Sequence, residues 1–137
     1  MAPTHVRAAN LALQLVAIQR GFPDAEGRVQ HGELVCAMPL QPTEASRTYT
    51  IRLAHRHGRQ PKITISDPIL QVHPEAPGLP HVYPGDELCL YYGGEWNDSQ
   101  LLATTVVPWT AEWLLHYELW LATGEWLGGG TSHGAPA

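Results

Sequence analysis

The sequence has 137 residues, of which 44% are hydrophobic and 15% are charged, and its formal net charge is −5. This size suits one compact domain with a single core, so we expect a domain over residues 1–127 and a short flexible tail over residues 128–137. The acidic balance and the lack of any run of basic residues argue against nucleic acid as a partner.

Membrane insertion and secretion are also disfavoured by the sequence. No stretch reaches the roughly 18 to 20 consecutive apolar residues that a membrane-spanning helix needs. The first residues include Arg7, Asn10 and Gln14, where a signal peptide would be uniformly apolar. Two cysteines are too few for a disulfide framework in a chain of this size. We therefore expect a cytoplasmic protein without membrane contact, in which each cysteine is a core residue or a reactive thiol.

The first predicted element is an amphipathic helix over residues 8–19. Leu11 and Ile18 recur at helical spacing on its apolar face, and Gln14 lies on the opposite, polar face. Gly21 is expected to end this helix.

Three strands are predicted next. Residues 33–40 and residues 48–53 alternate between apolar and polar side chains, and residues 61–65 form a shorter apolar run. Turn residues separate these segments, which predicts a three-strand antiparallel meander. Cys36 shares its strand phase with Leu34, so we expect its thiol to fill space in the core.

A long loop separates the meander from the C-terminal part of the chain. Residues 66–87 contain five prolines, so regular strand pairing cannot persist there. This loop delivers the segment Leu88-Cys89-Leu90-Tyr91.

Two helices are predicted after the cysteine. Ser99 is suited to cap a short helix that runs through Val106, and Pro108 is expected to end it and to open the next helix. That last helix, over residues 108–122, is apolar on most of its surface and should be largely buried. Gly124 is its natural stop.

The order of these elements resembles the ubiquitin-conjugating fold, and short motifs support the resemblance. Members of that family typically show a Pro-Lys-Val strand, a His-Pro-Asn loop, an Ile-Cys-Leu segment eight positions after the asparagine and a nearby tryptophan. The corresponding segments here are Pro61-Lys62-Ile63, Leu79-Pro80-His81, Leu88-Cys89-Leu90 and Trp96. Further aromatic residues between positions 91 and 126 make the chain similar to one bacterial branch, the stand-alone conjugating enzymes of CBASS anti-phage operons.

The resemblance implies an α+β fold of the ubiquitin-conjugating type, with an N-terminal helix, an antiparallel meander sheet, an active-site loop and C-terminal helices. It also implies that Cys89 is the catalytic nucleophile of a protein-conjugating enzyme. In that bacterial branch the cysteine carries the C-terminal glycine of a cGAS-like nucleotidyltransferase as a thioester and transfers it to an amine of a protein acceptor. No cofactor and no metal are implied.

His81 stands where relatives keep the asparagine that is usually assigned to stabilising the oxyanion of the transfer step. An imidazole can donate a hydrogen bond to an oxyanion, and it can also take a proton from the attacking amine. Both roles remain open, with the donor favoured. Tyr83, Asp86 and Trp96 are close to Cys89 in sequence and have no assigned role.

Two alternative functions and one alternative site are weighed against this interpretation. The donor could be a small β-grasp modifier of a bacterial ubiquitin-like pathway, or the chain could be a non-catalytic protein-binding module of the same fold. His55 and His57 are separated by one residue and could begin a metal site. Since a third ligand at a sensible spacing is missing, a solvated hairpin end is the favoured interpretation for this pair. Trp126 is the tryptophan expected to be partly exposed and to contact a partner.

Overall fold

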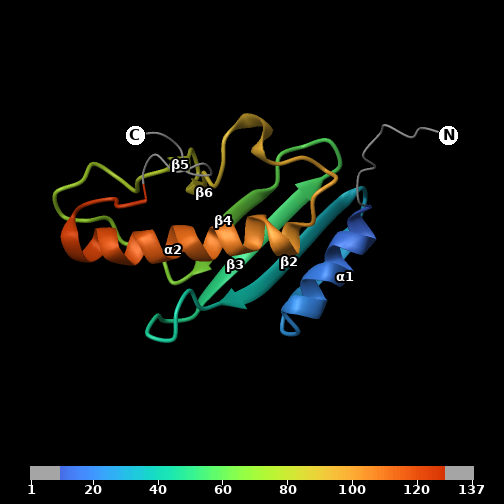
Figure 1. The fold of residues 1–137 in the computed structure, drawn as a ribbon, viewed down its shortest axis with the longest axis horizontal. Coiled ribbons are helices and arrows are strands. Elements are labelled where there is room, and N and C mark those ends of the chain that lie inside the picture. Colours follow the sequence, from blue (N-terminus) through green and yellow to red (C-terminus); the bar gives the residue numbers. More distant parts are fainter. Residues whose placement is uncertain (1–9, 129–137) are drawn as a thin grey trace.

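The computed structural model describes residues 10–128 as an α+β fold, as predicted. A four-stranded antiparallel sheet has the order β1-β2-β3-β4, and helix α2 lies across one face of it (Figure 1). The strands of this sheet are β1 (Glu26–Gln30), β2 (Glu33–Leu40), β3 (Tyr49–Arg56) and β4 (Lys62–Asp67). The remaining elements are α1 (Leu11–Gly21), the small hairpin of β5 (Val82–Tyr83) and β6 (Glu87–Leu88), the 3-10 helices η1 (Gly93–Glu95) and η2 (Leu102–Thr104), and α2 (Val106–Thr123). This arrangement is consistent with the ubiquitin-conjugating fold.

Helix α1 begins later than predicted and buries part of its polar face. The Asn10 side chain accepts a hydrogen bond from the Leu13 N–H at 2.7 Å and so caps the first turn. The prediction that Gln14 lies on the face opposite Ile18 is wrong, because these two residues are the buried residues of α1. The Gln14 side-chain amide donates to the Gln100 carbonyl at 2.9 Å, and its oxygen accepts the Leu102 N–H at 2.8 Å. Because both ends of the amide are paired, Gln14 can be fully buried and fasten α1 to the segment before α2.

The core lies between the main sheet and α2. Alternate residues of β2 and β3 point toward the helix, which follows from the two-residue period of a strand. Cys36 belongs to this row and is 1% exposed, so its predicted core position is confirmed. Glu118 of α2 accepts hydrogen bonds from the Ser46 and Tyr49 hydroxyls at 2.8 and 2.7 Å, which ties the helix to the β2–β3 connection.

The sheet has one strand more than the predicted meander of three. Strand β1 pairs with β2, but all five of its residues are exposed, so it carries no apolar alternation that periodicity could detect. The two residues between β1 and β2, His31 and Gly32, both have positive φ, as a tight hairpin turn requires. A Cβ on Gly27 would lie 2.8 Å from a methyl carbon of Leu15, so glycine lets α1 approach this edge closely.

The C-terminal helices differ from the prediction. No helix runs from Ser99 to Val106; only the short η2 forms there, and α2 begins at Val106 rather than at Pro108. Pro108 fits within the first turn of α2 because the N–H groups of that turn have no partner inside the helix. Gly124 ends α2 as predicted, with φ of 82° and its N–H bonded to the Trp120 carbonyl at 2.7 Å.

The chain after Gly124 doubles back along α2 toward the β5–β6 hairpin (Figure 1). Of the tail predicted over residues 128–137, only Gly128 is among the described residues, and it is buried. A Cβ at this position would lie 2.4 Å from the His116 ring, so this glycine is packed directly against α2.

Candidate functional site

Cys89 lies at the open end of the β5–β6 hairpin. The prediction that residues 66–87 contain no regular strand pairing holds only for the middle of that segment. Strand β4 extends to Asp67, and β5 and β6 pair across a turn in which Gly85 and Asp86 have positive φ. Cys89 follows β6, and its N–H donates to the His81 carbonyl at 3.0 Å. The structure therefore brings together the two residues that the sequence selected, through a main-chain hydrogen bond.

The Cys89 thiol is almost enclosed, with 4% of the residue exposed. Its Sγ lies 4.0 Å from the Tyr91 carbonyl oxygen. The Tyr83 side chain is hydrogen-bonded to Cys89, and this bond raises the pKa of the Tyr83 phenol against an opposing hydrogen bond from Gln60. The phenol therefore stays protonated at neutral pH and can serve as a hydrogen-bond donor to the sulfur.

His81 is held by its main chain and by packing of its ring. Its φ is 53°, in the left-handed region that is uncommon for residues other than glycine, although histidine, asparagine and aspartate adopt it more often than the rest. Its carbonyl accepts a second hydrogen bond from the Trp113 indole N–H at 3.1 Å. The imidazole packs against Trp126, with ring centroids 4.9 Å apart. The hydrogen bonds to the His81 carbonyl and the contact of its ring with Trp126 together fix this unusual backbone conformation.

The ring of His81 belongs to a cluster of packed rings, which we call the aromatic wall: His81, Trp113, His116 and Trp126. Trp126 lies at its centre, with ring centroids 5.3 Å from Trp113 and 5.8 Å from His116. His116 also lies 3.8 Å from the Glu112 carboxylate, one turn earlier in α2. Trp126 is partly buried, in line with the expectation of partial exposure. Its contact with a partner stays a prediction.

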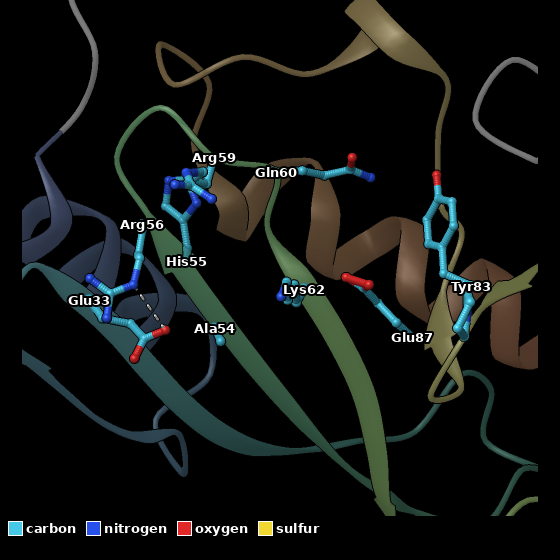
Figure 2. Close-up of a pocket in the computed structure, with 10 residues that line it drawn as sticks. Glu33, Ala54, His55, Arg56, Arg59, Gln60, Lys62, Tyr83 and Glu87 are labelled. Carbon is cyan, nitrogen blue, oxygen red and sulfur yellow. Dashed lines mark ion pairs between the residues drawn. The ribbon is translucent and has the colours of Figure 1, made fainter.

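A hollow of about 520 Å³, which we call the polar cleft, lies next to the hairpin and is lined by Tyr83, the residue whose side chain is bonded to Cys89. It lies between β3, β4 and the β5–β6 hairpin (Figure 2). Its charged and polar lining includes Arg56, Arg59, Gln60, Lys62, Tyr83 and Glu87. Arg56 is paired with Glu33 at 3.7 Å, and Figure 2 shows the Gln60 amide pointing toward the Tyr83 hydroxyl. Tyr83 therefore connects the two, since it lines the cleft and is hydrogen-bonded to Cys89.

The β3–β4 turn, which carries Gln60, is anchored by Asp98. The Asp98 carboxylate accepts the Gly58 N–H at 2.6 Å and lies 3.4 Å from His57 and 3.6 Å from His55. The prediction of a solvated hairpin end holds for His57 and is wrong for His55, which is 2% exposed and packs edge-on against Trp96. Burial lowers the pKa of His55, although the Asp98 charge opposes this effect.

Metal binding finds no support at this turn. Over residues 10–128, no group of three or more His, Cys, Asp or Glu side chains is placed to hold an ion. The contacts of His55 and His57 with Asp98 are those of a turn held in shape, and the two histidines have a structural explanation without a metal.

Sequence reasoning missed two contributors to this site. The sequence assigns no role to Tyr83, because only the fold brings its side chain to Cys89. No sequence pattern points to Asp98, because it is 40 residues from Gly58 in the turn that it anchors. The only sequence signal for Tyr83 was its place in the short segment that precedes the cysteine.

A family model described as a type II CBASS E2 protein (E2-CBASS) matches residues 14–134. This span includes Cys89, His81, the aromatic wall and the polar cleft. No curated protein matches the sequence. None of the helices in the described part of the chain is long and apolar enough to cross a membrane.

Proposed function

The chain belongs to the type II CBASS E2 protein family, and we propose that it works there as a cysteine-dependent conjugating enzyme whose nucleophile is Cys89. Family membership indicates a conjugating-type role in CBASS anti-phage defence. The observation that best supports Cys89 is its position at the end of the hairpin, bonded to His81 through the main chain and to Tyr83 through the side chain. Cys36, by contrast, lies in the core among apolar side chains.

The proposed reaction has two steps. The Cys89 thiolate attacks the carbonyl carbon of a C-terminal glycine that is activated as an acyl phosphate-type anhydride or as a thioester. A C–S bond to Cys89 forms, the bond to the activating group breaks, and a phosphate-type group or a thiolate leaves with the electron pair. An amine of the acceptor then attacks the thioester carbonyl. The C–N bond forms, the C–S bond breaks, the electron pair returns to Sγ, and the amine loses its proton to a base or to solvent. Sulfur suits both steps because its thiolate is a good nucleophile and a good leaving group.

The polar side of the site supports the first step. A phenol that donates to Sγ stabilises the thiolate, and the Gln60 bond fixes the hydroxyl so that it keeps this direction. In the second step the same donor would stabilise the sulfur as it regains its negative charge. Tyr83 is therefore proposed as a positioning and charge-stabilising residue.

The small exposure of Cys89 favours glycine as the residue that is carried. Because Cys89 is only 4% exposed, there is little room beside its thiol for a side chain on the donor's C-terminal residue. Glycine has no Cβ and also adopts backbone conformations closed to other residues, so a terminal glycine can approach closely. The donor is proposed to be a cGAS-like nucleotidyltransferase, and the acceptor a protein with a free amine.

His81 is proposed to act in the transfer step. Its packing against Trp126 and its fixed backbone hold the imidazole next to the hairpin that carries Cys89. A fixed donor costs little reorganisation when an oxyanion forms, which is the basis of such stabilisation. We favour this role over that of a base.

The central experiment mixes the protein with its candidate donor and the activating components, and compares gels run with and without thiol. We expect a heavier, thiol-sensitive band in the wild type and in Cys36→Ala, and no such band in Cys89→Ala. A band that is lost in Cys36→Ala and kept in Cys89→Ala would overturn the assignment.

A second experiment separates the two roles of His81. His81→Asn should keep most of the transfer activity if a hydrogen-bond donor is sufficient, and His81→Ala should slow aminolysis more than thioester formation. Single-turnover rates of the preformed thioester with a free amine measure this difference. Equal rates in all three proteins would exclude a catalytic role for His81.

A further inference from the structure

The polar cleft contains the only lysine of the chain. Lys62 is one of eight basic residues, and the other seven are arginines. This imbalance matters for an enzyme that carries an activated acyl group, because a guanidinium remains protonated and cannot attack a thioester, whereas a lysine amine can. A surface with almost no lysine is thus nearly inert toward the enzyme's own thioester.

The position of the single lysine is not remote from the thiol. Lys62 begins β4, is exposed, and lines the same cleft as Tyr83, whose side chain is hydrogen-bonded to Cys89. Strand β4 packs against β6, the strand that leads directly to Cys89. The residue that pairs with Lys62 on β3 is Ala54, whose small side chain leaves space next to the lysine.

The surroundings of the amine leave it available. Among the described residues, no carboxylate lies within ion-pair distance of Lys62, although Figure 2 shows the Glu87 side chain extending toward it. Arg56 and Arg59 on the same cleft supply positive charge without a nucleophile.

We propose that Lys62 is the internal acceptor of this enzyme, modified by its own Cys89 thioester. This inference rests on the proposed function. The neutral Lys62 amine attacks the glycyl carbonyl carbon, the C–N bond forms as the C–S bond breaks, Cys89 leaves as a thiolate, and the amine proton passes to solvent. The product is an isopeptide bond at the edge of the polar cleft, which would keep a transferred chain attached beside the site.

The test needs no native donor. A short peptide whose C-terminal glycine is a mercaptoethanesulfonate thioester can exchange directly onto Cys89. We expect two adducts on the wild type: a thiol-labile one on Cys89 and a thiol-resistant one that peptide mass spectrometry locates at Lys62. The resistant adduct should increase with pH between 7 and 9, since only the neutral amine attacks.

Three variants make the result specific. Cys89→Ala should lose both adducts, which excludes direct acylation of Lys62 by the reagent. Lys62→Arg should retain a thiol-labile adduct and lose the resistant one by at least about tenfold, the factor that corresponds to 1.4 kcal/mol in a barrier. The double variant Lys62→Arg with Arg20→Lys moves the single lysine to the exposed last turn of α1 and should also lack the resistant adduct.

The outcomes separate this inference from the proposed function. If no thiol-labile adduct forms on the wild type, the thioester role of Cys89 fails. If the labile adduct forms but the resistant one is missing, lies on the chain's α-amino group, or appears at residue 20 of the double variant as readily as at Lys62, the role of Lys62 alone is overturned.

Discussion

Two regions are linked to Cys89, the aromatic wall through His81 and the polar cleft through Tyr83, and they are built from different chemistry. The aromatic wall is formed largely by α2 and the segment after it, and its members hold one another by ring packing at centroid distances of 4.9 to 5.8 Å. The polar cleft is formed by β3, β4 and the hairpin, and its side chains are charged or amide groups near water. Burial of rings stabilises a fold, whereas exposed polar groups add little stability but can bind and move protons. We therefore expect the aromatic wall to fix the site and the polar cleft to serve the reaction.

The largest expected effect comes from Trp113 in the aromatic wall. This indole is 4% exposed and donates to the His81 carbonyl. Trp113→Ala should lower the free energy of unfolding by about 3–5 kcal/mol, because it removes a large buried ring and leaves a cavity. Urea denaturation measures this loss. Trp113→Phe keeps a ring without the N–H and should lose clearly less. A loss below about 1 kcal/mol for the alanine variant would contradict the structural role.

Trp126 is the next test, because it is only partly buried. Trp126→Ala should reduce the free energy of unfolding by roughly 1–2 kcal/mol, the value of a half-buried aromatic side chain with its ring contacts. It should also slow aminolysis, since the His81 ring loses its support. Leu127→Ala is the matched control, because this adjacent side chain is 61% exposed. If both variants behaved alike in denaturation and in transfer rate, Trp126 would not belong to the site.

Tyr83 tests the polar side of the comparison. Tyr83→Phe should slow thioester formation about tenfold, which corresponds to the roughly 1.5 kcal/mol of one hydrogen bond to a charged group. Its unfolding midpoint should remain close to that of the wild type, since the residue is 37% exposed. Tyr92→Phe provides a control at another exposed tyrosine. A large loss of stability with normal rates in Tyr83→Phe would reverse the roles assigned to the two sides.

The sequence predicted the parts of this molecule that depend on local patterns. Strand alternation identified β2 and β3, the core position of Cys36 followed from it, and Gly124 marked the end of α2. Strand β1 escaped detection because its pairing depends on main-chain hydrogen bonds and a two-residue turn, with no buried side chain to set a period.

The contacts around Cys89 were less accessible to such patterns. The motif spacing joined His81 to Cys89, and the structure places a main-chain hydrogen bond between them. The bonds of Gln14 to residues 100 and 102, and of Asp98 to the β3–β4 turn, join segments that are far apart in sequence. Polar residues with such distant partners look solvent-exposed in a sequence, which explains the errors for Gln14 and His55.

The smallest expected effect concerns His55, which helps to anchor the turn that carries Gln60. Burial lowers the pKa of His55 in the folded state, while in the unfolded chain histidine titrates near pH 6.5. Between these two values the unfolded state binds more protons, so stability is complete above about pH 6.5 and falls as the pH drops below it. The Asp98 charge raises the pKa of His55 and the His57 charge lowers it. Because Asp98 opposes burial, the free energy of unfolding should change only modestly with pH.

Urea midpoints measured between pH 7.5 and 5.5 would reveal this dependence, and the difference between wild type and His55→Gln isolates it from the carboxylates. His57→Gln, at a side chain that is 68% exposed, removes only the smallest of the three influences on the pKa of His55 and should keep most of the wild-type slope. If His55→Gln kept the slope as well, the buried histidine would not be the titrating group. Thioester formation could also slow over the same pH range in the wild type but not in His55→Gln. That result would show that the polar cleft needs the buried His55 to keep its shape, as the aromatic wall needs its packed rings.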